Sequence, residues 1–183
     1  EAANVMVELA DLYHQHGRVL GLIRVAQTFT AAHPVDQRHQ QMMLKLMDGL
    51  EVMSRTKDLI VACRQFLERY PQAPQAAQIE IRLARTLLES VDRESAAAAH
   101  RVVWKRHRAT PVGRVHGVQA LRLYLDQLGG EFVVQGAELA EEMYDALPKG
   151  EFARQIGWKA FESWKRIREY AKSNVVGNKM LQR

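Results

Sequence analysis

The sequence predicts an all-α fold, a right-handed solenoid of about four helical hairpins followed by a C-terminal capping helix. Apolar residues recur with helical spacing from end to end, and no segment alternates with the period of two that marks a strand. Proline interrupts this pattern at intervals of 37, 40 and 37 residues, at Pro34, Pro71, Pro111 and Pro148. A recurrence of about 20 to 50 residues is typical of stacked-repeat proteins, in which neighbouring repeats bury each other's apolar faces.

The prolines divide the chain into segments that each hold two helices. The predicted hairpins cover, in order, residues 3–34, 36–71, 73–111 and 112–148. A capping helix is expected over 151–172, which makes nine helices in all, and residues 173–183 are expected to form a frayed tail or a linker because they show little apolar periodicity.

Local signals account for the helix boundaries. Gly17 and the pair Gly129 and Gly130 follow helical segments, where glycine adopts the left-handed conformation that ends a helix. Asp36 can cap the N-terminus of the third helix. Pro74 stands where the fifth helix begins, and proline is well tolerated in a first turn. Each predicted helix therefore has a physical start or stop.

Two columns of side chains repeat with the prolines and predict the core. Small residues stand eight positions before three of the prolines, at Ala26, Cys63 and Ala140. Bulky residues stand five positions before the same prolines, at Phe29, Phe66 and Met143. A small and a large residue three apart share a helix face, so that one helix can approach closely while its neighbour fills the groove. Trp104 takes the bulky role in the third copy, seven residues before Pro111.

The composition is that of an ordinary globular protein or a short repeat array. Of 183 residues, 47% are hydrophobic and 26% are charged, and the apolar runs are far shorter than the roughly 20 residues that cross a bilayer. The chain starts at Glu1, so we expect a processed product or a piece of a larger bacterial protein, with any membrane tether outside this segment. With Cys63 as the single cysteine, no internal disulfide can form, and the compartment stays open between cytoplasm and periplasm.

One stretch carries a resemblance to a known family. FLERYP at 66–71, followed by APQAAQ at 73–78, resembles the tetratricopeptide-repeat superfamily of helical hairpins, and FTAAHP at 29–34 is a second version of the pattern. The stretch is similar to repeats of bacterial envelope scaffolds such as outer-membrane assembly lipoproteins and Tol-Pal-associated periplasmic proteins. The chain departs from the family in its longer period and in lacking the W-x-x-L-G-x-x-Y opening. The resemblance implies a binding scaffold whose inner helices line a concave groove.

A basic column repeats in the same register. Eleven residues after each of the four prolines stands a base, at Lys45, Arg82, Arg122 and Lys159. Four residues before three of these bases stands a glutamine, at Gln41, Gln78 and Gln155. Residues four apart share a helix face. The column is interpreted either as a solvated face whose bases pair with Asp and Glu, or as the lining of a groove for an acidic peptide or a C-terminal carboxylate.

The last predicted helix carries Trp158, Phe161 and Trp164 at spacings of three. These side chains are expected to seal the last hairpin. In the alternative, they form an exposed face that docks a partner or a second copy, since tryptophan and tyrosine are favoured at binding hot spots. The second reading makes the chain a structural self-association domain.

No motif indicates an enzyme. HExxH, P-loop, GxGxxG and cysteine-pair motifs are absent, and no residue pair suits a general acid and base, so no cofactor or metal is expected. Turn and capping roles explain His33, Asp36 and His39 better than a metal site does. The basic run from Lys105 to Arg108 suits a helix C-terminus, which disfavours nucleic acid as the partner. The expected function is a protein-interaction scaffold that uses a basic groove.

Overall fold

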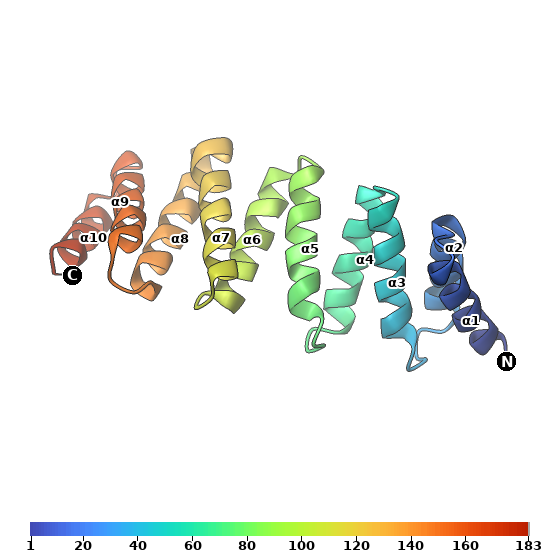
Figure 1. Ribbon diagram of the computed structural model, residues 1–183. Coiled ribbons are helices and arrows are strands. Elements are labelled where there is room, and N and C mark those ends of the chain that lie inside the picture. Colours follow the sequence, from blue (N-terminus) through green and yellow to red (C-terminus); the bar gives the residue numbers. More distant parts are fainter. Residues whose placement is uncertain (183) are drawn as a thin grey trace. The chain divides into compact units, whose positions relative to one another are not determined.

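A computed structural model describes residues 1–182, and in this range the chain forms ten α-helices and no β-strand (Figure 1). The all-α prediction is therefore confirmed. The helices are α1 (Ala2–Gln15), α2 (Val19–Ala32), α3 (His39–Val52), α4 (Thr56–Arg69), α5 (Ala76–Glu89), α6 (Arg93–His107), α7 (Pro111–Arg122), α8 (Val133–Ala146), α9 (Glu151–Arg166) and α10 (Tyr170–Gln182). In the described residues, no helix has the length and apolar character needed to cross a membrane.

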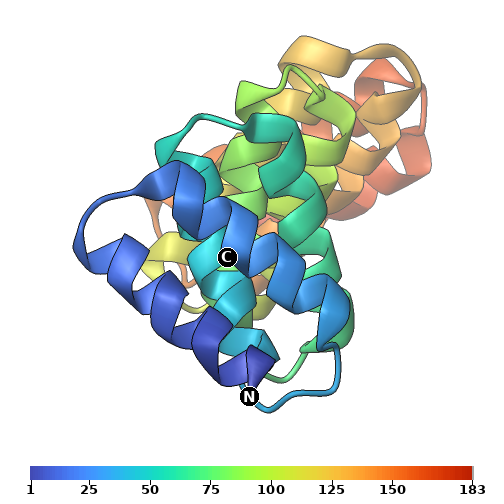
Figure 2. The ribbon, with the colours of Figure 1, turned by 90° about the vertical axis from the view of Figure 1, so that its right-hand side faces the viewer.

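The helices belong to two compact units. The first unit runs from Glu1 to Ser90 and contains α1 to α5, and the second begins at Val91 and contains α6 to α10. Within each unit every helix packs against its neighbours in the chain. Figure 2 turns the first unit towards the viewer and shows α1 and α2, in blue, in front of α3 and α4.

The 37-residue period is visible in the positions at which helices begin. In the first unit α1, α3 and α5 begin at Ala2, His39 and Ala76, which are 37 residues apart. In the second unit α8 and α10 begin at Val133 and Tyr170, again 37 apart. The interval from α6 to α8 is 40 residues because α7 continues into a π-helical segment, Leu123–Leu128, and then a 3-10 turn, Gly130–Phe132.

Pro111 differs from the other helix-ending prolines. It was expected to end the sixth helix, but α6 ends at His107 and Pro111 is the first residue of α7. The hydroxyl of Thr110 caps α7 by accepting a hydrogen bond from the backbone N–H of Gly113 at 3.2 Å. Proline suits this position because its fixed φ is helical and its missing N–H would have had no partner there.

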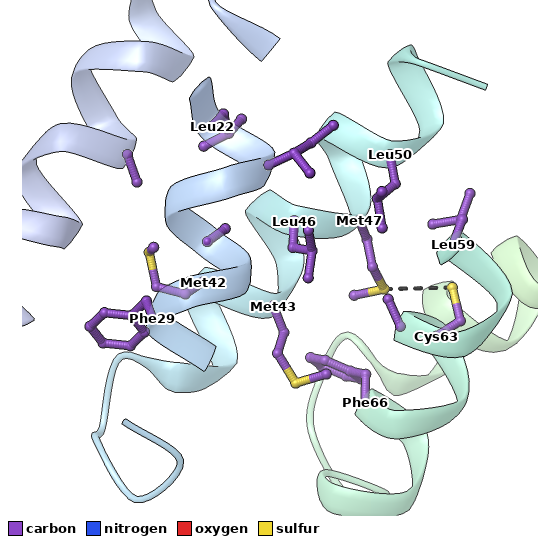
Figure 3. Close-up of a cluster of buried hydrophobic side chains, with 14 of the residues drawn as sticks. Leu22, Phe29, Met42, Met43, Leu46, Met47, Leu50, Leu59, Cys63 and Phe66 are labelled. Atoms are coloured by element: carbon purple, nitrogen blue, oxygen red, sulfur yellow. Dashed lines mark hydrogen bonds between the residues drawn. The ribbon is translucent and has the colours of Figure 1, made fainter. Parts of the chain in front are cut away.

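The predicted core columns are buried. In the first unit Ala26, Phe29, Cys63 and Phe66 are inaccessible to solvent, and methionines of α3 fill the space between them (Figure 3). The Cys63 thiol donates to Met47 Sδ at 3.5 Å, the contact that Figure 3 marks with a dashed line. In the second unit Trp104, Ala140 and Met143 are inaccessible too.

The C-terminal prediction is wrong in two respects. The helix expected over 151–172 stops at Arg166, where Arg168 adopts a positive φ of 65° and turns the chain. Residues 170–182, expected to be largely a tail, form α10, which packs on α9 and buries Val176. Position 183 lies outside the described residues. Part of the attachment of α10 is polar and leaves no apolar pattern in the sequence, since Lys179 Nζ lies 2.8 Å from Asp145 Oδ2 and 3.1 Å from Glu141 Oε1 of α8.

Candidate partner-binding surfaces

The predicted basic column has two different environments. In the first unit both of its bases are paired with acids. Lys45 on α3 forms an ion pair with Asp11 on α1, and its side chain is only 12% exposed. Arg82 on α5 has Nη2 2.8 Å from Asp48 Oδ1 and 3.2 Å from Glu51 Oε2, both on α3.

These ion pairs have a common geometry. Asp11 and Lys45 are 34 residues apart in the chain, and so are Asp48 and Arg82. On α3 the base Lys45 faces α1, while the acid one turn later, Asp48, faces α5. In the first unit, basic and acidic side chains therefore alternate and neutralise one another, so that the column does not form a continuous basic surface. In the sequence, the signal for this pairing was an acid 34 residues before each of these bases, at Asp11 and at Asp48.

A groove lies between α3 and α5 and has a volume of about 510 Å³. Its lining combines apolar, amide and charged side chains. They are those of Leu44, Asp48, Gln75, Gln78, Ile79, Ile81, Arg82 and Arg85. We call it the α3/α5 groove. Of the predicted site residues it brings together Gln78, which is exposed, and Arg82. Gln41 is exposed on α3 but does not line the groove.

In the second unit the column residues are exposed. Arg122 ends α7, and Gln155 and Lys159 lie on α9. Within residues 1–182, neither Arg122 nor Lys159 has a carboxylate within the 4.0 Å of an ion pair. Gln155 and Lys159 line a shallow depression of about 610 Å³ together with Glu151, Arg154, Trp158 and Met180. Sequence reasoning did not single out Arg154, although it precedes Trp158 by one helical turn, or Met180 of α10.

The three aromatic residues of α9 do not share one environment. Trp164 is buried, and its indole N–H donates to Glu141 Oε2 at 3.1 Å, so this side chain is not available to a partner or a second copy. Trp158 is 56% exposed, although it was expected to help seal the last hairpin. Its ring stacks on half-buried Phe161 with centroids 5.2 Å apart and an interplanar angle of 21°. Trp164 therefore seals the hairpin, and Trp158 faces solvent.

The trio of His33, Asp36 and His39 serves the turn before α3. Asp36 accepts hydrogen bonds from the side chain and the backbone N–H of Arg38, which together hold the pKa of the carboxyl well below its usual range. His39 Nδ1 lies 2.8 Å from the Tyr70 hydroxyl. Across residues 1–182 no three His, Cys, Asp or Glu side chains come together as a metal site would require.

Comparison with solved structures shows which fold the chain has. No family model matches the chain, and no curated protein matches it. Among solved structures, a tetratricopeptide repeat protein from Parabacteroides merdae superposes with a TM-score of 0.56 at 12% identity, covering 98% of this chain and 66% of that one. MamA from Desulfovibrio magneticus RS-1, residues 41 to the end, gives 0.52 at 12% identity and covers 100% and 94%. The chain has a tetratricopeptide-like solenoid fold.

At this level of identity the likeness concerns the tetratricopeptide-like fold alone. It confirms the resemblance read from FLERYP and its neighbours. Within the tetratricopeptide-like fold, α3 and α5 are the first helices of consecutive repeats. The α3/α5 groove thus lies between the first helices of two consecutive repeats.

Proposed function

We propose that the chain is a protein-interaction module that binds a segment of a partner protein on the first helices of its repeats. The observation that carries this proposal is the α3/α5 groove, which lies between two such helices and combines apolar and polar groups. Leu44 and Ile81 are half-buried and offer apolar contact, and exposed Gln78 offers both hydrogen-bond donors and an acceptor. A groove of this composition suits an extended or helical segment with mixed polarity.

The ion pairs change the roles proposed for the bases. Lys45 is committed to Asp11 and contributes to the structure of the first unit. Arg82 is held in place by Asp48 and Glu51 and presents a preorganised guanidinium at the groove wall. Arg122 and Lys159 of the second unit are exposed and remain open to acidic groups, which we propose as a secondary contribution beside the groove.

Photo-crosslinking tests the groove without disturbing its ion pairs. A benzoylphenylalanine replaces Gln78, and in a control variant it replaces Val61 on α4, which is also exposed and belongs to the same unit. Illumination of cells of the source organism is expected to give discrete protein adducts from position 78 that position 61 does not give. Equal adduct patterns from the two positions would refute the groove as a binding site.

An Arg82→Glu change is a poor substitute for this experiment. It would set three carboxylates together, since Asp48 and Glu51 already lie within 3.2 Å of the guanidinium. Like charges at this distance destabilise the folded unit. Lost binding would then report on stability as well as on recognition.

A further inference from the structure

We infer that an exposed surface of α9 docks an acidic segment of a partner protein through a tryptophan anchor flanked by cations. This surface, the α9 patch, consists of the residues that line the depression on α9, together with Phe161 beneath the tryptophan ring: Glu151, Arg154, Gln155, Trp158, Lys159, Phe161 and Met180. The inference rests on the proposed function, because it assumes that the chain binds proteins, and it adds a second site and the chemistry of its ligand.

Trp158 stands apart from the other tryptophans. Trp104 and Trp164 are buried, while more than half of Trp158 is open to solvent. Stacking on Phe161 fixes the ring, so that little side-chain entropy is lost when an apolar group packs against it. The indole N–H is a hydrogen-bond donor to which a carboxylate or carbonyl of a ligand can bind. A rigid, amphipathic aromatic of this kind is a typical hot-spot residue.

The charges around Trp158 are available to a ligand. Arg154 and Lys159 line the same depression as Trp158, and neither has a carboxylate within 4.0 Å in the described part of the chain. In contrast, Lys45, Arg82, Arg101 and Lys179 are all held in ion pairs. A guanidinium and an ammonium without internal partners favour carboxylates of a ligand, and the arginine can bind one through two hydrogen bonds.

The same charges disfavour a second copy of the chain. A two-fold symmetric contact through the α9 patch would bring its unpaired cations against themselves, in a protein whose net charge is +5. Glu151 and Glu162 lie on the exposed surface of α9 and interrupt its positive charge, which disfavours the uniform phosphates of a nucleic acid or an anionic membrane. A protein segment can present both a carboxylate for the cations and an apolar group for Trp158.

Peptide display supplies the ligand for the test. A random peptide library is panned against the immobilised chain, and enriched peptides are titrated against three forms by fluorescence anisotropy: wild type, Arg154→Glu with Lys159→Glu, and Lys57→Glu with Arg64→Glu. The last pair is a matched control, because both residues are exposed on α4 and the change in net charge is identical. Binding is also followed by NMR through the indole N–H signals of the three tryptophans, with that of Trp158 assigned from Trp158→Phe.

We expect enriched peptides with net negative charge and at least one aromatic or aliphatic residue. Their affinity should fall by roughly tenfold or more on reversal of Arg154 and Lys159 and stay unchanged in the α4 control. The Trp158 indole signal should shift on binding, while those of buried Trp104 and Trp164 stay in place.

Several results would overturn the inference. Enriched peptides without an acidic bias, or affinities that do not change when Arg154 and Lys159 are reversed, would refute the α9 patch as a binding site. If Gln78→Ala weakens the binding of those peptides instead, the inference fails and the proposed function stands. If no peptide is enriched over the bare support, both fail. Phosphatidylserine vesicles or an oligonucleotide that bind α9 more strongly than the peptides, or concentration-dependent sedimentation abolished by Trp158→Ala, would assign the patch to another class of ligand.

Discussion

His100 Nδ1 lies 2.8 Å from His116 Nδ1, and the two imidazoles are buried where α6 packs against α7. Their ring centroids are 4.7 Å apart. One nitrogen must donate and the other must accept, so the contact requires at least one neutral ring. Burial, together with the neighbouring His116, lowers the pKa of His100 to about 4.

This pKa predicts that the second unit loses stability in mild acid. Above pH 6.5, the ordinary pKa of histidine, His100 is neutral in the folded and the unfolded state and contributes no pH dependence. As the pH falls from 6.5 towards 4, the unfolded chain binds a proton that the folded state resists. The free energy of unfolding should fall over this window by on the order of 3 kcal/mol.

Urea titrations followed by tryptophan fluorescence measure this effect, since all three tryptophans belong to the second unit. A His100→Asn variant should show a shallower dependence of unfolding free energy on pH. Identical slopes for the variant and the wild type would show that His100 does not cause the acid sensitivity.

Two glycines of α7 should differ in how they tolerate alanine. A Cβ at Gly113 would collide with the backbone carbonyl of His107, which cannot move without breaking the turn between α6 and α7. At Gly117 the nearest atom is Met143 Cε, 2.7 Å away at the end of a flexible side chain, although Trp104 Cδ2 at 3.2 Å limits the room. We expect Gly113→Ala to cost about 3 kcal/mol or more and Gly117→Ala about 1 kcal/mol.

Urea denaturation gives both values, and Val112→Ala, at an exposed position of the same helix, provides the baseline. Equal costs at positions 113 and 117 would contradict the distinction between a fixed and a movable neighbour.

The turn between the two helices of each repeat recurs as a backbone with positive φ. One such residue in each of these turns lies 37 to 39 positions from the next, at Gly17, Ser54, Val91, Gly129 and Arg168. Ser54 holds a φ of 52°, which is unfavourable for a residue with a Cβ. We expect Ser54→Gly to stabilise the first unit by about 0.5 to 1 kcal/mol.

The reciprocal change, Gly17→Ser, tests the same cause at the equivalent turn. No atom lies within 4 Å of a Cβ built at Gly17, so the backbone alone should set a loss of about 1 kcal/mol. Thermal and urea unfolding followed by circular dichroism report both changes. A gain from Gly17→Ser would show that the turn is not under strain.

Cys63 should be unreactive in the folded protein. It is buried beside Met47, and burial raises the pKa of its thiol to about 12. At a given pH the fraction of Cys63 present as thiolate, which is the reactive form, is therefore about a thousandfold lower than that of an ordinary thiol. Ellman's reagent should label one thiol per chain in denaturant and almost none in native buffer; similar rates in the two conditions would place Cys63 at the surface.

The local pattern predicted most of the fold because helix signals act over a few residues. Apolar spacing and the stops at Gly17 and Pro34 give the first hairpin within a few residues of its observed ends. The prediction failed where such signals have two meanings. A proline such as Pro111 can either end one helix or begin the next, and the sequence pattern is the same in both cases. Arg168 makes a turn at a position where no glycine or proline marks the end of the helix. The segment after it appeared unstructured because α10 gains its order from contacts with α8 and α9.

The candidate surfaces depended on tertiary structure. The amino-acid sequence by itself determined the all-α class, the 37-residue register and the side chains that occupy each column, since these follow from spacing along one helix. Whether a base in that column is paired depended on residues 34 positions away, as with Asp48 and Arg82. The exposure of the Trp158 side chain and the burial of the Trp164 side chain depended on which face of α9 is covered by α8 and α10. Spacing gives a side chain its place on a helix, whereas its neighbours across the helix interface decide its exposure and its charge partners.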